Sequence, residues 1–140
     1  MAEKRPYSET QTLLRNAGLR LTKQRVALGR LLLDGPNRHV TAEKFHEEAL
    51  AQGIRVSLAT VYNTLHQFTD AGLLRQVTVD GGKLYFDTNT SEHPHFYFED
   101  EESLMDIPSD SVQITNSPKT PQGTAIASVD VIVRLKSDPS

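Results

Sequence analysis

The sequence predicts an α+β protein, and two observations about the spacing of its apolar residues support this. In four segments of the first 72 residues, apolar side chains recur every three or four positions, as on the buried face of an amphipathic helix. From residue 73 onward the spacing becomes two, which is typical of strands with one buried face. We therefore expect helices first and strands after them.

Each expected helix begins at a hydroxyl residue and ends near a glycine. Serine and threonine side chains accept hydrogen bonds from the first helical turn, and glycine adopts the left-handed conformation common after the last turn. Gln11, three residues after Ser8, adds the pattern of a capping box. The four pairs of cap and closing glycine are Ser8 and Gly18, Thr22 and Gly35, Thr41 and Gly53, and Ser57 and Gly72.

The inward faces of these helices consist of aliphatic and phenylalanine side chains. We expect a buried stripe on each helix, since the apolar positions fall on one side of a 3.6-residue turn. The expected inward residues are Leu13, Leu14 and Ala17; Val26, Leu28, Leu31, Leu32 and Leu33; Phe45, Ala49 and Leu50; and Leu58, Val61, Leu65 and Phe68.

Two strand-like segments follow the helices, at residues 73–79 and 83–87. They flank the sequence Asp80-Gly81-Gly82, which is a strong signal for a hairpin turn. Helices followed by a two-stranded ribbon are the element order of a winged helix-turn-helix, with the third and fourth helices as the pair. We expect residues 1–87 to form a winged-helix DNA-binding domain.

The fourth helix has an outward face made of short or hydrogen-bonding side chains. Such side chains can contact base edges and phosphates in a major groove. The helix also lacks lysine and glutamate, which solvated faces normally carry, and this favours DNA over the alternative of a plain amphipathic helix in a protein-binding domain. The outward residues are Ser57, Ala59, Thr60, Tyr62, Asn63 and His66.

A polar hinge at residues 88–92 leads to a second region, residues 93–140. We expect a strand near residues 95–99, a pairing strand near 103–107, and a long strand at 125–137 whose alternate residues form one apolar face. About 48 residues bury little surface alone. We therefore expect a small dimerisation domain in which this sheet pairs with a second copy, and a homodimer fits a two-fold DNA site.

Composition excludes several classes of function. Cysteine is absent, so disulfides, thiolate metal sites and cysteine nucleophiles are excluded. No apolar run is long enough to span a membrane, and the N-terminal residues lack the apolar middle of a signal peptide, so we expect a cytoplasmic protein without a membrane partner. The chain has no nucleophile–base pair, no glycine-rich phosphate loop and no His-Glu-x-x-His motif, so we do not expect an enzyme.

Charge is distributed unevenly along the chain. Residues 1–30 carry seven Lys or Arg and two Glu, whereas residues 93–140 carry three basic and eight acidic residues. This asymmetry indicates an N-terminal part that faces a polyanion and an acidic C-terminal part. From charge alone, a solvated basic face explains the N-terminal excess equally well.

His93 and His95 are the one close pair among the five histidines. Residues at positions i and i+2 of an extended segment share a face, so both rings can reach one centre. Imidazole together with carboxylate suits divalent first-row metals. The alternative is a pair of surface histidines at the polar edge of a strand.

Four stretches of the sequence resemble the ferric uptake regulator family: "GLRLTKQRVALGRLL", "HVTAEKFHEEA", "VSLATVYNTLHQFTDAGLL" and "HPH". The resemblance covers about residues 10–107. Within this family, the absence of cysteine and the stretch "DTNTSEHPHFYFEDEESLMDIP" look most like the iron response regulators, Irr, of alpha-proteobacteria. The resemblance implies an N-terminal winged helix followed by a small α/β dimerisation domain. It also implies a metal- or haem-responsive repressor that controls iron and haem homeostasis genes by binding a double-stranded operator.

The resemblance also implies site residues by position. Five residues match the family's hinge metal site, and they would hold Fe²⁺ or Mn²⁺, with Zn²⁺ as a substitute in vitro: His39, Asp87, His93, His95 and Asp106. Arg20 matches a basic residue that enters the minor groove, and Tyr62 matches a tyrosine of the major groove. Asn63 replaces an arginine common in iron-sensing relatives, which indicates a different target sequence.

The resemblance further implies an effector. Irr-like relatives respond to haem, for which His93 or His95 is a candidate axial ligand, and a haem-synthesis protein is a candidate partner. The alternative within the family is a peroxide-sensing repressor, in which bound iron oxidises a histidine ligand. The cysteines of the family's structural zinc site are missing. A second metal site is also degraded, with Glu92, Pro94 and Gln113 at its positions.

Overall fold

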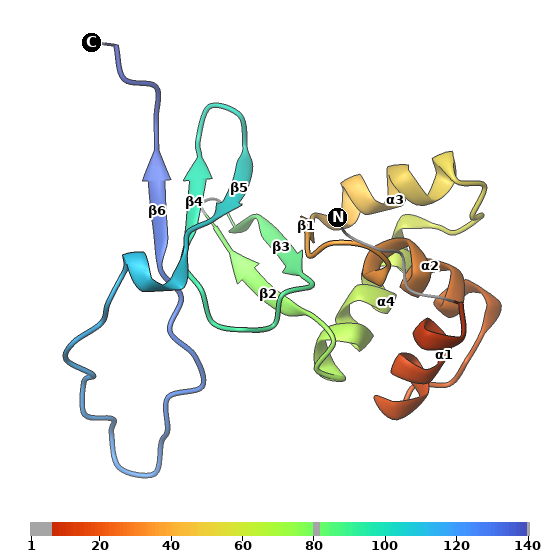
Figure 1. Ribbon diagram of the computed structural model, residues 1–140, viewed down its shortest axis with the longest axis horizontal. Helices are drawn as coiled ribbons and strands as arrows, with labels where there is room; N and C mark the ends of the chain where they lie inside the picture. The colour runs from red at the N-terminus through yellow and green to blue at the C-terminus, as the bar shows by residue number, and fades with distance from the viewer. Residues whose placement is uncertain (1–6, 80–81, 140) are drawn as a thin grey trace. The chain divides into compact units, whose positions relative to one another are not determined.

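The structure of the protein is a computed structural model that describes residues 7–79 and 82–139. The chain divides into two compact units at the boundary between Thr90 and Ser91 (Figure 1). The first unit combines helices with a three-stranded sheet, and the second contains another three-stranded sheet. The expected α+β fold class is confirmed.

Four α-helices build most of the first unit: α1 (Tyr7–Asn16), α2 (Lys23–Leu33), α3 (Ala42–Ala51) and α4 (Leu58–Asp70). Three of the expected caps are confirmed. The side chains of Thr22, Thr41 and Ser57 each accept a hydrogen bond from a backbone N–H three residues later, at 3.1, 3.3 and 3.0 Å. The first cap was misplaced, because Ser8 lies inside α1.

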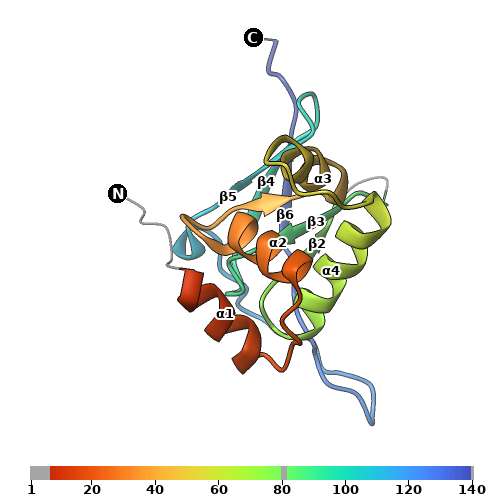
Figure 2. The ribbon, with the colours of Figure 1, turned by 90° about the vertical axis from the view of Figure 1, so that its right-hand side faces the viewer.

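The core of the first unit joins all four helices, seen together in Figure 2, to two strands of the adjoining sheet. Its fully buried side chains are Leu14, Leu28, Leu32, Phe45, Ala49, Val61, Leu65, Phe68 and Phe86. Two leucines expected inside are exposed instead, Leu50 by 50% and Leu58 by 41%. Leu50 lies in the last turn of α3 and Leu58 in the first turn of α4. The apolar spacing of the sequence extends to these turns, but at a helix end there is no further turn to help bury the side chain.

The wing contains β2 (Arg75–Thr78) and β3 (Leu84–Asp87), which pair antiparallel as expected. The turn residues Asp80 and Gly81 lie outside the described residues. A third strand was not predicted: β1 (His39–Val40) pairs with β3 and completes the order β1-β3-β2. This pairing sets His39 directly opposite Asp87.

The second unit is organised around β4 (His95–Phe98). The predicted hairpin with β5 (Ser103–Asp106) is confirmed, and β6 (Ile132–Leu135) lies on the other side of β4, parallel to it. The 3-10 helix η2 (Ser109–Ser111) follows β5. Alternation along β4 also holds, with His95 and Tyr97 buried while Phe96 and Phe98 are partly exposed.

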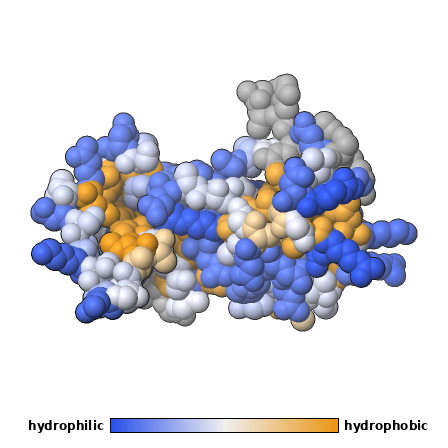
Figure 3. All heavy atoms as spheres, turned by 90° about the horizontal axis from the view of Figure 1, so that it is seen from below, coloured by the Kyte–Doolittle hydropathy of each residue, from blue (hydrophilic) through white to orange (hydrophobic). Residues whose placement is uncertain are grey.

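The long C-terminal strand expected at residues 125–137 is only four residues long, Ile132–Leu135. Its neighbour β4 has four residues, so β6 has no further backbone to pair with. Residues 112–131 contain no helix or strand, and Ile126 and Val129 are exposed. Apolar side chains at the surface are visible as orange patches in Figure 3. No helix within the described part of the chain is long and apolar enough to cross a bilayer.

Asp100 ties the end of β6 to the turn between β4 and β5. Its carboxylate accepts hydrogen bonds from the hydroxyl of Ser137 at 2.6 Å and from the backbone N–H of the same residue at 3.2 Å. These donors, the hydroxyl first, lower the pKa of the exposed Asp100 carboxyl below its usual value. The contact holds the strand's free end against the sheet.

Candidate metal centre and nucleic-acid interface

Three candidate ligands meet at one end of the paired strands β4 and β5, away from their connecting turn. The pairing of β4 with β5 sets His95 opposite Asp106, and His93 lies two residues before the strand. The Nε2 atoms of His93 and His95 lie 3.1 and 3.3 Å from the same carboxylate oxygen, Oδ1 of Asp106. The two imidazole rings are 4.4 Å apart between centroids. Three donor groups thus converge within the second unit.

The two ring nitrogens of His93 have different neighbours, a backbone carbonyl and the Asp106 carboxylate. Its Nδ1 lies 2.7 Å from the backbone carbonyl oxygen of Ser91, which can only accept, so Nδ1 carries a proton. In the neutral ring Nε2 is then an acceptor, and it faces another acceptor, Oδ1 of Asp106. Two facing lone pairs repel, so a cation between them, either a proton or a metal ion, is required to stabilise the arrangement.

The separations fit a metal ion. Metal–nitrogen and metal–oxygen bonds of about 2.1 Å put adjacent ligands roughly 3.0 Å apart at octahedral angles and roughly 3.4 Å apart at tetrahedral angles. The distances of 3.1 and 3.3 Å lie within this interval. His95 is 2% exposed, so its imidazole is also removed from water. The residues present therefore fit a divalent first-row metal.

The other two predicted ligands lie together in the first unit. His39 in β1 and Asp87 in β3 are directly paired residues of neighbouring antiparallel strands. The Asp87 carboxylate is buried and accepts a hydrogen bond from the backbone N–H of Asn89 at 2.9 Å, while the His39 ring meets Tyr85 edge-on. The wing thus contributes a second pair of competent donors. Strand β1 explains why these two residues meet, and it was not predicted from the sequence.

Helix α4 presents the outward face expected of a DNA-reading helix. Ser57, Ala59, Tyr62 and Asn63 are exposed, and Thr60 is half-buried. The Ser57 hydroxyl contacts both the backbone N–H and the hydroxyl of Thr60 at 3.0 Å, so the first turn is rigidly capped. The tyrosine ring is 45% exposed. A helix N-terminus with uncharged polar groups can receive a phosphate or a base edge.

His66 does not belong to this outward face, contrary to the expectation that it contacts DNA phosphate or solvent. Its Nδ1 lies 3.0 Å from the side-chain amide of Gln76 in β2, and its Nε2 is buried without a hydrogen-bond partner. The ring packs between Tyr62 and Phe86, at centroid distances of 4.4 and 5.3 Å. It supports the Tyr62 ring from the protein side, and the four-residue spacing from Tyr62 could have indicated this.

His46, in α3, is half-buried. Its Nε2 lies 2.9 Å from the carbonyl oxygen of Val56, just before α4. The contact helps to hold the connection between α3 and α4. A bond of this kind between a helix and the following loop leaves no periodic signal in the sequence.

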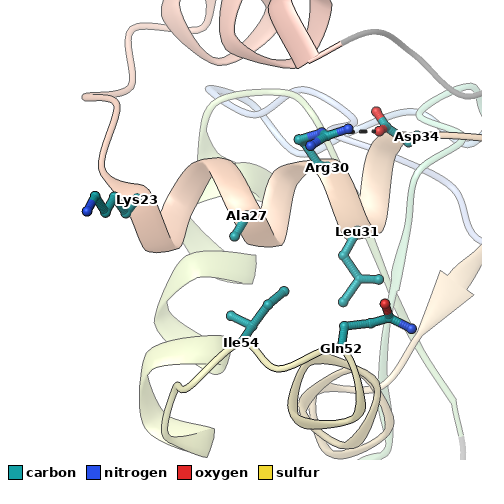
Figure 4. A pocket seen from close by; sticks show the side chains of 7 residues that line it. All are labelled: Lys23, Ala27, Arg30, Leu31, Asp34, Gln52 and Ile54. Carbon is teal, nitrogen blue, oxygen red and sulfur yellow. Dashed lines mark ion pairs between the residues drawn. The ribbon is translucent and has the colours of Figure 1, made fainter.

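A surface pocket of about 420 Å³ lies elsewhere in the first unit (Figure 4). It is lined by Lys23, Ala27, Arg30, Leu31, Asp34, Gln52 and Ile54, from α2 and the end of α3. Arg30 and Asp34 form an ion pair at 3.6 Å at its rim. None of the predicted metal or DNA residues lines this pocket.

Comparison with known proteins gives one consistent result. The sequence profile of the Ferric uptake regulator family matches residues 16–134. The chain is 34% identical over 107 residues to the Ferric uptake regulation protein of Shigella flexneri, spanning 76% of this chain and 72% of that protein. The corresponding Klebsiella pneumoniae protein is 32% identical over 108 residues, spanning 76% and 70%.

Solved structures agree with the sequence relatives. The Vibrio cholerae ferric uptake regulator superposes with a TM-score of 0.70 at 26% identity, covering 91% of this chain and 98% of that chain. The Pseudomonas aeruginosa regulator, solved with manganese, gives a TM-score of 0.68 at 26% identity, covering 91% and 97%. The similarity therefore includes both units.

Proposed function

The chain belongs to the ferric uptake regulator family, and on that premise we propose that it is a transcriptional repressor whose binding to an operator depends on a divalent metal. Members of this family are transcription regulators rather than enzymes. The finer features of the proposal concern the ligands, the effector and the DNA-reading residues of this chain.

One observation carries the metal dependence: the Nε2 atoms of His93 and His95 both face Oδ1 of Asp106 at ligand–ligand distance. Imidazole and carboxylate without thiolate suit Fe²⁺ or Mn²⁺ and also accept Zn²⁺ in vitro. The manganese in the Pseudomonas aeruginosa structure supports the same class of ion. Binding requires neutral imidazoles, so metal affinity falls as the pH falls.

The proposal extends the ligand set to His39 and Asp87 of the first unit. Three donors from the second unit leave positions open in the shell of an octahedral ion, and the wing holds two further donors opposite each other. Ligands from both units would make the ion a clip that biases the arrangement of the winged helix for DNA. The bound ion would supply the positive charge that offsets the buried carboxylate of Asp87.

For the DNA contact we propose the exposed face of α4 together with Arg20. Tyr62 and Asn63 would reach base edges, while Ser57, Ala59 and Thr60 would lie against the backbone at the helix N-terminus. A homodimer supports two-fold operator binding. The exposed Ile114, Ile126 and Val129 of the second unit favour such an assembly, since a small sheet gains most of its burial from a second copy.

Haem is the further effector that we propose, as the resemblance to Irr implies. His93 and Pro94 line a surface pocket of about 200 Å³ together with polar residues and with Val129 and Val131, so apolar side chains adjoin a candidate axial ligand. Haem is bulkier than a bare ion, and its binding there would distort the metal-bound geometry. We expect partial release of the operator, since a complete switch needs about 5.5 kcal/mol of differential binding.

The experiment is a DNA-binding titration on the full chain, first with Mn²⁺ and then with added haem. Wild type should bind an operator, selected from random-sequence duplexes, tightly with Mn²⁺ and weakly with a chelator. The variant carrying both His93→Ala and His95→Ala should show neither metal nor haem dependence. Equal responses in both proteins would disprove the role of these histidines. Addition of an oxygen atom to His93 or His95 after peroxide treatment of the Fe²⁺ form would instead favour peroxide sensing.

A further inference from the structure

The side chain of Arg25 joins two separate parts of the proposed DNA interface. Its Nη1 donates a hydrogen bond to the backbone carbonyl of Arg20 at 2.6 Å, and its Nη2 donates to Oε1 of Gln67 at 2.7 Å. Arg20 lies in the segment before α2, whereas Gln67 lies in the last turn of α4. One guanidinium group therefore connects segments that are more than 40 residues apart in the sequence.

The local sequence explains why Arg25 is in position for both contacts. Its backbone N–H donates to the hydroxyl of the cap residue Thr22, which places it in the first turn of α2. Side chains of a helix point toward its N-terminus, so the guanidinium extends back toward Arg20 and across to α4. The planar guanidinium has five donors in a fixed fork, which lets one side chain serve two acceptors in set directions.

A neighbouring contact ties the same turn of α2 to the other end of the recognition helix. The side-chain amide of Gln24 donates to the carbonyl of Arg55 at 3.4 Å, two residues before the cap Ser57. The first turn of α2 thus contacts the chain just ahead of α4 and again near its C-terminal end. Because Arg25 supplies the shorter and charge-assisted pair of bonds, it is the stronger of the two ties.

We propose that Arg25 is a positioning residue for operator recognition: it sets the distance between Arg20 and the face of α4 that carries Tyr62. This inference rests on the proposed function, in which Arg20 and α4 enter different grooves. The spacing between neighbouring grooves is a property of the duplex, so the two reading elements must be held at a matching separation. Residues 19–22 lie outside any helix or strand; Leu19 and Leu21 pack against the core, and the Arg25 hydrogen bond fixes the Arg20 carbonyl between them.

The role differs from that of a phosphate contact. The Nη1 and Nη2 hydrogen bonds of the guanidinium both end on oxygen atoms of the protein itself, so its main effect is to pre-order the Arg20 segment before binding. Without the tie, the segment must be ordered when the operator binds. If one additional backbone residue must be ordered when the operator binds, the affinity for the operator falls by about 5- to 30-fold.

The test uses Arg25→Lys in the full-length protein loaded with Mn²⁺. Lysine keeps the positive charge, but one ammonium nitrogen cannot occupy the positions of both Nη1 and Nη2. We expect a loss of about 5- to 30-fold in affinity for the operator selected by wild type. Affinity for random-sequence duplex, its dependence on salt concentration and the thermal unfolding midpoint should remain as in wild type.

Two further variants make the result specific. Arg30→Lys is the matched control, because Arg30 lies on the same helix and pairs with Asp34 of that helix rather than with α4. It should bind the operator like wild type. Gln67→Leu removes the acceptor on α4 and should reproduce the Arg25→Lys loss, and the double variant should be no weaker than either single one.

The outcomes separate this inference from the proposed function. If Arg20→Ala and Tyr62→Phe both leave operator affinity unchanged, the proposed interface itself is wrong. If they weaken binding but Arg25→Lys matches wild type, the positioning role is wrong. If Arg25→Lys weakens binding to the operator and to random duplex equally, Arg25 binds phosphate and the proposal is overturned. If the loss comes with a lower unfolding midpoint, Arg25 contributes to stability and the proposal is likewise overturned.

Discussion

Replacing Asp106 by asparagine should abolish most of the metal-dependent stability of the protein. The Oδ1 atom of Asp106 is the point on which both histidine Nε2 atoms converge, so the substitution removes the one negative charge shared by the two rings. Asparagine keeps the shape of the side chain, and its amide can donate to the lone pair of a neutral imidazole. The metal-free protein should therefore fold as well as wild type.

The magnitude follows from ligand loss and linkage. Changing a residue that only supports a ligand already costs 10- to 100-fold in metal affinity, so loss of a ligand should weaken binding by at least about 100-fold. At a free Mn²⁺ concentration about 100 times the wild-type dissociation constant, the ion stabilises wild type by about 2.7 kcal/mol but the variant by only about 0.4 kcal/mol. At about 4 °C per kcal/mol, the metal-induced rise in Tm should be about 10 °C for wild type and about 2 °C for the variant.

The assay is thermal unfolding followed by circular dichroism across a Mn²⁺ titration, with a chelated sample as reference. Asp110→Asn is the matched control, since Asp110 lies on the neighbouring 3-10 helix and is not among the proposed ligands. It should show the full wild-type shift. A wild-type Tm that does not respond to Mn²⁺, or an Asp106→Asn protein that responds like wild type, would refute the reasoning.

Three other outcomes are expected. Ser57→Ala removes the cap of α4 and should lower the free energy of unfolding by about 1 kcal/mol in urea denaturation, and an unchanged midpoint would contradict the cap's contribution. Arg20→Ala should weaken operator binding by about 1–3 kcal/mol if the side chain reads a base, measured by fluorescence anisotropy; an unaltered affinity would place the interface elsewhere. Val129→Asp puts a charge on the exposed apolar surface of the second unit and should shift the wild-type dimer toward monomer in light scattering, whereas a wild-type monomer at micromolar concentration would rule out the proposed assembly.

The sequence by itself determined the features that depend on near neighbours along the chain. Thr22, Thr41 and Ser57 were identifiable as caps because each bonds to a backbone N–H only three residues away. The apolar stripes and the hairpin strands followed from periods of 3.6 and 2 for the same reason. Two of the candidate ligands, His93 and His95, could likewise be paired from their spacing of two residues.

Tertiary structure decided what depends on pairing between distant segments. The register of β4 against β5 brings Asp106 opposite His95, and the two-residue strand β1 brings His39 opposite Asp87. Strand β6 is short because its partner β4 is short. His66 turns inward because its ring contacts the side-chain amide of Gln76 in β2. The guanidinium of Arg25 reaches an acceptor on α4 that no local pattern indicates. Such contacts form only when segments far apart in the sequence come together. The periodicity within one helix or strand does not indicate which distant segment it will pair with.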